Sequence, residues 1–319
     1  MERSAALVRK HLVMKEKRIT VESSRPIRLN HFTPLRYPGG KGKLAAFVKE
    51  LMGRNGLFDG EYVEPYAGGA AIALELLLQE YVSHIHINDI SRPIYAFWKS
   101  VLDDTEDLVR LIRNTPITVQ TWDLQKRVLA NPQDHDNLRL GFAAFFLNRT
   151  NRSGILNAGI IGGRGQSGPW KIDARFNAVE LAYRVESIAK LRSRISLSRE
   201  DARKFLLKRL DRFPEKTLIY LDPPYYIKGK ELYYDYYVHQ DHEDIAALVT
   251  KKIRRQKWIV SYDKVDAIRD MYADCRSIVY GIGYSAREAR SGSEVMFFCN
   301  ALQVPPLTGA MKVLGRRAA

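Results

Sequence analysis

The sequence predicts an α/β protein with a doubly wound, mainly parallel seven-stranded sheet and an inserted, mostly helical module. Three observations support this prediction. Seven short β-rich runs occur along the chain. Helical patterns lie between most of them, which is typical of parallel strands joined by crossover helices. One long interval, residues 99–190, does not fit this rhythm, and we assign it to the insertion.

The β-rich runs follow one another in this order: EYVEPY (61–66), HIHINDI (84–90), ISLS (195–198), LIYLDPPYY (218–226), KWIVSYD (257–263), SIVYGIGY (277–284) and EVMFFCNA (294–301). The helical pattern GGAAIALELLLQEY follows the first run, and HEDIAALVTKKIRRQ follows the fourth. Only SAREARSGS separates the last two runs, which is too short for a typical crossover helix. We therefore expect these two runs to form an antiparallel hairpin.

Composition divides the rest of the chain and indicates its partner. Residues 31–98 and 191–305 carry the sheet, a basic arm (1–30) precedes them, and a basic tail (306–319) follows. The formal net charge is +15, of which the arm supplies +5 and the tail +3. A basic body with basic ends suits a polyanion, and nucleic acid is the commonest. The alternative is a solvated surface that is merely basic.

Other classes of protein fit the sequence less well. The most apolar stretch, AIALELLLQEYV, is interrupted by Glu75, Gln79 and Glu80, so we expect no membrane span. Cys275 and Cys299 are too few for a disulfide framework or a metal cluster. We therefore expect a cytoplasmic protein with no membrane partner and no metal.

Residues suited to ligand binding follow the first three predicted strands, where an open α/β sheet binds its ligands. Gly68 and Gly69 follow the first strand, where a missing Cβ lets the backbone approach a ligand. Asp89 ends the second strand and Asp201 the third. Each could instead be structural, the glycines as a turn and the acids as helix N-caps. Together they outline a site for an adenosine-bearing cofactor, although G-x-G-x-x-G is absent.

The fourth strand ends in Asp222-Pro223-Pro224-Tyr225, a turn that two prolines make stiff. The carboxylate of Asp222 and the carbonyl of Pro223 can accept both protons of an amine attached to an aromatic ring. These hydrogen bonds direct the nitrogen lone pair out of the ring plane, toward an electrophile. Tyr225 can stack on the base that carries the amine. The turn therefore predicts chemistry at the exocyclic amine of a nucleobase.

With these motifs the sequence resembles the Dam-like family, alpha-group adenine-specific DNA methyltransferases that use S-adenosylmethionine. The resemblance covers residues 33–301 and rests on LRYPGGKGKL, YVEPYAGGAAIALEL, INDI, SREDARKFL and LIYLDPPYY, with KWIVSYDK and SGSEVMFFCN less specific. It implies a Rossmann-like methyltransferase fold with residues 99–190 as target recognition domain. It implies that the cofactor is surrounded by Tyr37, Gly39, Gly40, Lys41, Pro65, Gly68, Asp89 and Asp201. It also implies that an adenine flipped out of double-stranded DNA is held by Asp222, Pro223, Pro224 and Tyr225.

The stretch FFLNRTNRSGILNAG resembles the recognition hairpin of that family. It places residue types that read bases around Gly154, namely Asn148, Arg149, Asn151, Arg152 and Ser153. Arg36 matches a position at which the family's GATC readers carry a DNA-contacting lysine. Those readers have an intercalating aromatic residue where this chain has TNRS, so GATC specificity is not predicted. For the two arginines of the stretch, contact with phosphate alone is the alternative.

The predicted activity is site-specific methylation of adenine N6 in duplex DNA. Three alternatives remain: an RNA adenine methyltransferase, a cytosine-N4 methyltransferase, and a DNA-binding module without catalysis. Asp222 argues against the second, which usually has serine at that position. Retention of Asp89, Asp201 and Asp222 together argues against the third. The recognition sequence, the oligomeric state, a companion endonuclease and a restriction role are left open.

Overall fold

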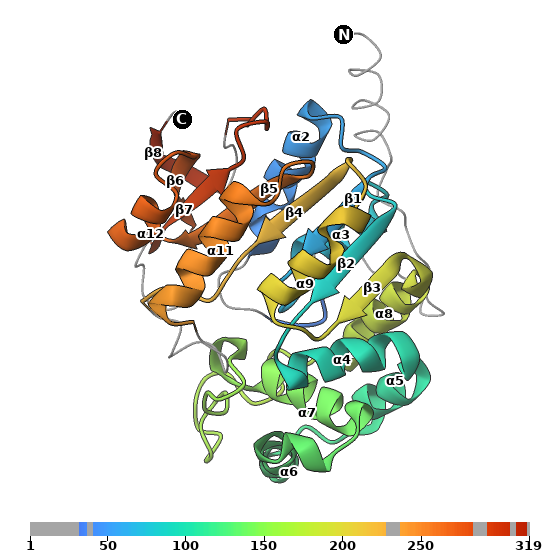
Figure 1. The fold of residues 1–319 in the computed structure, drawn as a ribbon. Coiled ribbons are helices and arrows are strands. Elements are labelled where there is room, and N and C mark those ends of the chain that lie inside the picture. Colours follow the sequence, from blue (N-terminus) through green and yellow to red (C-terminus); the bar gives the residue numbers. More distant parts are fainter. Residues whose placement is uncertain (1–31, 37–40, 228–236, 283–291, 307–310, 318–319) are drawn as a thin grey trace.

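The computed structural model describes residues 32–36, 41–227, 237–282, 292–306 and 311–317. Its centre is an eight-stranded sheet with the order β3-β2-β1-β4-β5-β7-β6-β8 (Figure 1). The strands are β1 (Glu61–Glu64), β2 (His84–Asn88), β3 (Ile195–Ser198), β4 (Thr217–Leu221), β5 (Lys257–Asp263), β6 (Arg276–Ile282), β7 (Gly292–Phe298) and β8 (Met311–Arg317). The first five pair in parallel, whereas β7 lies antiparallel between β5 and β6. The mainly parallel sheet and the terminal hairpin of the sequence prediction are therefore confirmed.

Strands β1 and β4 lie side by side at the centre of the sheet. Every residue of β4 is buried, as expected for a parallel strand covered on both faces. From β1 the chain crosses to β2 on one side, and from β4 it crosses to β5 on the other. Because such crossovers are right-handed, their helices cover opposite faces and leave a crevice at the carboxyl ends of β1 and β4.

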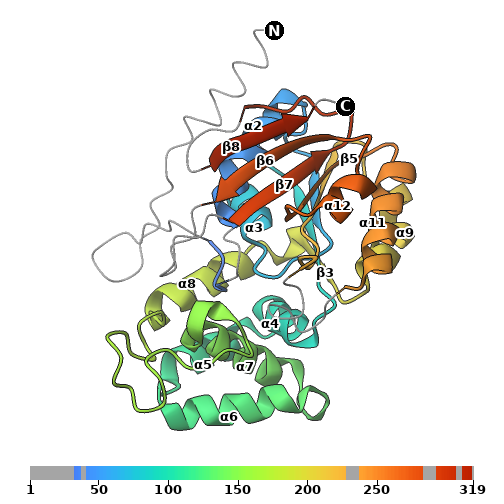
Figure 2. The same ribbon diagram turned by 90° about the vertical axis from the view of Figure 1, so that its left-hand side faces the viewer.

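Two groups of helices cover the two faces of the sheet (Figure 2). One group is η1 (Lys41–Leu44), α2 (Ala45–Arg54) and α3 (Ala71–Leu78), and the other is α9 (Ala202–Arg209), η5 (Leu210–Arg212), α11 (His239–Lys251) and α12 (Asp266–Met271). The helices expected after the first and fourth strands are present as α3 and α11. Their apolar residues, such as Leu74 and Leu77 of α3 and Ile245 of α11, are buried in the main core.

Between β2 and β3 the chain forms five helices, the first four of which lie beyond the carboxyl ends of these strands (Figure 1). They are α4 (Arg92–Asp103), α5 (Thr105–Asn114), α6 (Val119–Ala130), α7 (Asn137–Thr150) and α8 (Ala178–Ala189), with the 3-10 turns η2 (Pro132–Asp134), η3 (Arg152–Gly154) and η4 (Arg192–Arg194) near them. The helical segment begins at Arg92, directly after β2, rather than at residue 99. Helix α7 is buried on nearly all sides, and its Phe145 stacks on Phe97 of α4 at 5.7 Å.

Gly141 allows α4 and α7 to pack closely. A Cβ added at this position would lie 2.6 Å from the carbonyl oxygen of Ala96. We expect Gly141→Ala to lower the free energy of unfolding by about 1–3 kcal/mol, although alanine in a helix is normally the more favourable residue by nearly 1 kcal/mol. Urea unfolding would measure the change. Gly165→Ala is the control, because nothing lies within 4 Å of a Cβ there, and an equal loss in both variants would contradict the packing argument.

Two parts of the sequence prediction differ from the structure. The tail contributes β8, which pairs with β6 and brings the sheet to eight strands rather than seven. In the sequence, the basic residues of the tail obscure the pattern of this short strand. In the structure, the strand covers an edge that β6 would otherwise expose. The expected hairpin of the insertion is instead the last turn of α7 followed by η3, with one isolated bridge between Asn151 and Ile160. The helical pattern GFAAFFL continues into NRT, so α7 extends to Thr150 where part of the hairpin was expected. The expected arm, residues 1–30, lies outside the described residues.

Candidate active site

Asp222 lies directly after β4, at the crevice between β1 and β4. Its Oδ1 accepts a hydrogen bond from Ser261 Oγ of β5 at 2.8 Å and lies 3.1 Å from the ammonium of Lys41. Ser261 in turn is bonded to the hydroxyl of Tyr220 at 2.8 Å. Among the described residues none donates a hydrogen bond to Oδ2, and the side chain is 20% exposed. One carboxylate oxygen is therefore anchored, and the other can accept a ligand.

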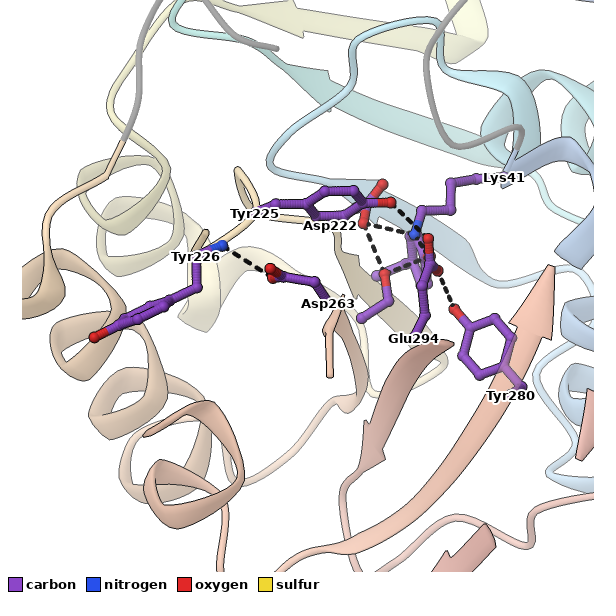
Figure 3. A network of polar contacts seen from close by, with 9 residues as sticks. Lys41, Asp222, Tyr225, Tyr226, Asp263, Tyr280 and Glu294 are labelled. Atoms are coloured by element: carbon purple, nitrogen blue, oxygen red, sulfur yellow. Dashed lines mark hydrogen bonds and ion pairs between the residues drawn. The ribbon is translucent and has the colours of Figure 1, made fainter. Parts of the chain in front are cut away.

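A buried carboxylate, Glu294 of β7, joins the groups around Asp222 (Figure 3). Its Oε2 accepts from Lys41 Nζ at 2.7 Å and from the Tyr280 hydroxyl at 2.7 Å. Its Oε1 accepts from the Tyr225 hydroxyl at 2.5 Å. The Lys41 ammonium also lies 5.5 Å from the centre of the Tyr225 ring. Sequence analysis missed Glu294, whose signal is an acid inside the apolar run EVMFF.

Burial and charge set the ionisation of these three groups. Burial raises the pKa of Asp222, and Glu294 adds to this, whereas Lys41 opposes it. Burial opposes the charge of Lys41, but Asp222, its tyrosine neighbours and Glu294 hold its pKa well above the usual value. Burial also opposes the charge of Glu294, yet Lys41 and the hydrogen bonds of Lys41 and the tyrosines bring its pKa below the usual value. The ammonium thus stabilises both carboxylates.

The backbone of the Asp-Pro-Pro-Tyr turn is held by Asp263, the last residue of β5. Asp263 Oδ1 accepts from the amide of Tyr226 at 2.9 Å, and Oδ2 accepts from the amide of Ile227 at 3.2 Å. Pro223 is buried and Pro224 is half-buried. Because neither proline has a backbone N–H, this turn has few other donors. Sequence analysis missed Asp263, although an acid at the next strand end along the sheet is a usable signal.

The glycine loop after β1 is bonded to the acid at the end of β2. Gly68 has a φ of 46°, which favours glycine, and its amide donates to Asp89 Oδ2 at 2.8 Å. Asp89 Oδ1 accepts from the amide of Ser91, which is the N-cap residue of α4. The indole of Trp98 donates to the carbonyl of Gly68 at 2.9 Å. Asp89 therefore does not cap α4 itself but lies against the glycine loop.

Asn88 fixes the carboxyl ends of three neighbouring strands. Its amide nitrogen donates to the carbonyls of Pro65 and Glu200, and its Oδ1 accepts from Ser198 Oγ and the Glu200 amide. The side chain is fully buried, so these bonds are protected from water. Sequence analysis missed this residue, because an asparagine beside a predicted ligand-binding acid gives no clear signal.

The remaining expected cofactor residues fall into three groups. Asp201 accepts from the Lys204 amide at 3.0 Å, so it caps α9, one of the two roles that the sequence allowed. Lys41 forms ion pairs with Asp222 and Glu294, so it lies beside the Asp-Pro-Pro-Tyr turn. Tyr37, Gly39 and Gly40 lie outside the described residues.

Glu64, the last residue of β1, is a second buried acid that sequence analysis missed. It is 5% exposed, and its Oε1 accepts from the Ala73 amide at 3.2 Å. Burial raises the pKa of Glu64 to about 8, and the charge of Asp222 adds to this. Glu64 is therefore largely protonated at neutral pH.

The structure corrects the expected positions of two of the DNA-contacting residues. Asn148 is 1% exposed, and its side-chain amide pairs with the backbone of Arg36 at 2.7 and 2.6 Å and donates to the Gly154 carbonyl. Asn151 is also buried; it accepts from the Trp122 indole at 2.6 Å and donates to the carbonyls of Ile155 and Leu156. Both side-chain amides are engaged in hydrogen bonds within the protein, and neither is presented at a loop tip.

The arginines of this region form a basic cluster. Arg149 donates through Nε to the Arg175 carbonyl at 2.6 Å, and no hydrogen bond joins its terminal nitrogens to a described residue. Burial, with the charges of Arg36 and Arg184, lowers the pKa of Arg149 to about 9. Burial and the charge of Arg175 also lower the pKa of Arg36. Such a cluster favours a bound anion. Arg152 and Ser153 are exposed beside it, and Ser153 has a φ of 56°.

The described part of the chain lacks two other kinds of feature. No group of three or more His, Cys, Asp and Glu side chains there could hold a metal ion. No helix in those segments is both long and apolar enough to span a bilayer. Both cysteines are buried, and burial raises the pKa of Cys275 to about 11. These thiols therefore stay protonated and suit packing rather than nucleophilic attack.

Comparison with known proteins adds to this geometry. Residues 37–284 match the model of the D12 class N6 adenine-specific DNA methyltransferases. The chain belongs to this family. It is an adenine-specific DNA methyltransferase, and the resemblance found in the sequence is confirmed.

Two individual proteins resemble this methyltransferase. The Type II methyltransferase M.MjaIII of Methanocaldococcus jannaschii is 23% identical over 240 residues, which cover 70% of this chain and 78% of that protein. The crystal structure of protein LPL1258 from Legionella pneumophila is 12% identical and covers 85% of this chain and 88% of its own, with a TM-score of 0.32. That score is too low to show a shared fold.

Proposed function

We propose that this methyltransferase transfers the methyl group of S-adenosylmethionine to N6 of an adenine that it has turned out of duplex DNA at a defined sequence. The observation that carries the proposal is the anchored carboxylate of Asp222. Its Oδ1 is held by Ser261 and Lys41, while Oδ2 can accept a proton of the adenine amine. A target amine inside a duplex must first be extruded, at a cost of a few kcal/mol.

The turn orients the adenine for attack. Asp222 Oδ2 and the Pro223 carbonyl accept the two amine protons, and Tyr225 stacks on the base. These contacts direct the lone pair of N6 toward the methyl group. Formation of the new N–C bond would be matched by breakage of the donor's S–C bond, with S-adenosylhomocysteine as the leaving group. N6 then gains positive charge, which the carboxylate of Asp222 stabilises at close range. The raised pKa of Asp222 also suits it to receive the proton that N6 then loses.

The described residues fit S-adenosylmethionine as the methyl donor. Lys41, Asp222 and Glu294 together carry one net negative charge at a buried position, which complements a sulfonium cation. Asp89 and Gly68 lie together where ribose hydroxyls bind in comparable sheets, and Asp201 lies at the end of the adjacent β3. When bound, the sulfonium supplies an activated methyl group, and the protein supplies orientation and electrostatics.

Asp89→Asn should weaken S-adenosylmethionine binding by about 10-fold or more. The amide lacks the negative charge that strengthens the hydrogen bonds accepted from the ribose hydroxyls. DNA binding should change little, since the hydrogen bonds of Asp89 go to the glycine loop and to Ser91, not to the basic cluster. Calorimetric titration with the cofactor measures the first effect, and fluorescence anisotropy with labelled duplex measures the second. Asp266→Asn on the exposed start of α12 is the control. Unchanged cofactor affinity in Asp89→Asn would limit Asp89 to tying the glycine loop.

We assign the helical insertion, within residues 99–190, the role of target recognition domain, and we place DNA across Arg36, Arg149, Arg152 and Ser153. The terminal nitrogens of Arg149 and the neighbouring positive charges suit backbone phosphate. The exposed side chain of Arg152 suits a base edge, to which arginine can bind in a bidentate manner. The buried amides of Asn148 and Asn151 are not part of this interface.

Two variants separate these roles. Arg149→Gln should weaken cognate and random duplexes by the same factor and reduce the salt slope by about one unit. Arg152→Ala should weaken the cognate duplex alone, by about 1–3 kcal/mol. Binding of both variants to both duplexes across a salt series tests this. An equal loss on both duplexes for Arg152→Ala would make Arg152 a phosphate contact.

The overall proposal is tested by incubating the protein with methyl-labelled S-adenosylmethionine and nucleic acid, followed by nucleoside analysis. Labelled N6-methyladenine from duplex DNA is expected. Label in N4-methylcytosine, or in RNA only, would support an alternative, and no transfer at all would support a DNA-binding module. Sequencing modified bases in DNA from cells that express the chain would give the recognition sequence. Because the relative M.MjaIII is named a Type II methyltransferase, the cells from which this chain comes should also be searched for a partner endonuclease.

A further inference from the structure

We propose that Glu294 is a positioning residue for methyl transfer, which acts by holding the Lys41 ammonium and the Tyr225 ring against the catalytic turn. The inference rests on the proposed role of Asp222. Glu294 lies on β7 and contacts the turn after β4 through the side chains of Lys41 and Tyr225. It touches neither the base nor the donor in the proposed complex, so it acts through its neighbours.

The geometry gives Glu294 two arms that reach the catalytic turn. One is the Lys41 ammonium, 2.7 Å from Glu294 Oε2 and 3.1 Å from Asp222 Oδ1. The other is the Tyr225 hydroxyl, 2.5 Å from Glu294 Oε1. Tyr280 supplies a further donor at 2.7 Å and helps fix the carboxylate. Because Glu294 is only 2% exposed, water cannot replace these partners cheaply.

The first arm keeps Asp222 available as an acceptor. One ammonium serves two carboxylates, so Glu294 competes with Asp222 for it. Without the charge of Glu294, Lys41 would pair with Asp222 alone. This tighter ion pair would engage the Asp222 carboxylate, which has to accept a hydrogen bond from the adenine amine.

The second arm orients the ring that stacks on the adenine. Tyr225 belongs to the turn itself, and its hydroxyl is fixed by Glu294. Loss of this hydrogen bond frees the ring to rotate, while the hydrophobic surface of the ring remains. Small displacements of an orienting group can cost about 100-fold in rate. We therefore expect this arm to affect capture of the flipped base.

The pKa of Asp222 provides a readout that would not depend on Glu294 if Glu294 had a purely structural role. The titratable groups that face it are Lys41 of η1, Tyr62 and Glu64 of β1, Tyr220 of β4, Tyr262 of β5 and Glu294 of β7. Burial raises the pKa of the three tyrosines and of Glu64, so these are neutral near pH 7. Among these groups Lys41 and Glu294 carry charge, and they act on Asp222 with opposite sign.

The test compares Glu294→Gln, Glu294→Asp, Lys41→Met and Tyr225→Phe with Ser293→Ala. Ser293 precedes Glu294 on the same strand, and its side chain points to the opposite face. Two readouts are used. One is the pH profile of kcat on duplex DNA. The other is the fluorescence of 2-aminopurine at the target position in complexes with S-adenosylhomocysteine, which reports base capture without turnover.

Glu294→Gln should lower kcat by on the order of 100-fold with little change in KM for DNA. Its acidic limb should move to lower pH, because loss of a neighbouring negative charge lowers the pKa of Asp222. Lys41→Met should move this limb to higher pH. Glu294→Asp keeps the charge and should keep the limb near its original place. Glu294→Gln and Tyr225→Phe should both lose 2-aminopurine fluorescence, Tyr225→Phe without the shift of the limb, and Ser293→Ala should resemble the wild type.

A fall in kcat for Glu294→Gln without a shifted limb or a changed fluorescence signal would overturn the proposal and leave a structural role. Should Glu294→Gln not fold, as judged by thermal unfolding, Lys41→Met and Tyr225→Phe carry the test. An unshifted limb in Lys41→Met, or an unchanged 2-aminopurine signal in Tyr225→Phe, overturns the proposal equally. Failure of the proposed function is distinguishable, because the wild type itself would then not form N6-methyladenine.

Discussion

Asp222→Ala should reduce methyl transfer to adenine by on the order of 10³-fold or more, while S-adenosylmethionine still binds. The variant removes the acceptor that orients the amine and stabilises the charge that develops on N6. Lys41 keeps Glu294 as its partner, so the buried ammonium is not left alone. Single-turnover kinetics with labelled donor measures the first effect, and calorimetry the second.

Asp222→Asn is the matched control for this prediction. Its amide retains one oxygen that can accept from the adenine amine but carries no charge, so an intermediate rate is expected. Near-normal turnover in Asp222→Ala would rule out the mechanism. Loss of cofactor binding in both variants would instead show that Asp222 belongs to the donor site.

Glu64→Gln should change how stability depends on pH. The pKa of Glu64 is raised by burial to about 8, above its ordinary value of 4.5. Between these two values the folded protein holds a proton that the unfolded chain has released. The wild type therefore loses stability as pH rises through this window, by up to about 1.4 kcal/mol per pH unit. Glutamine is neutral throughout, so the variant should lose less stability and should be the more stable protein at pH 8.

Urea unfolding of the wild type and Glu64→Gln from pH 5 to pH 9 measures this difference. Other titrating groups are common to both proteins and cancel in the comparison. Glu50→Gln, on the exposed side of α2, should follow the wild-type slope. Parallel curves for the wild type and Glu64→Gln would mean that Glu64 titrates alike in the folded and unfolded chains.

The positions of the Asp-Pro-Pro-Tyr turn and of the strand ends could be predicted because their signals are local. LIYLDPPYY holds a buried strand, a stiff turn and an acid in consecutive residues, and the structure places them at the carboxyl end of β4. Gly68 and Asp89 were predicted separately and prove to share a hydrogen bond. Sequential signals suffice where a parallel sheet brings its strand ends to one edge.

The partners of these residues could not be predicted, because they depend on packing between distant segments. Asp263 contacts the turn because β5 lies beside β4, and Glu294 contacts it because β7 lies beside β5 in antiparallel register. Asn148 and Asn151 have the chemistry of base readers, yet local backbone groups and Trp122 use their amides. Residue type indicates what a side chain can bind, and only tertiary structure decides whether it is already engaged.

The position of β7 in the sheet has a consequence for biosynthesis. Lys41 and Asp222 emerge from the ribosome well before Glu294, which completes their network from a strand inserted between β5 and β6. A nascent chain that stops short of β7 therefore lacks the carboxylate that shares Lys41 with Asp222. Competence for DNA modification should thus arise late in synthesis, and truncated translation products should not mark the genome.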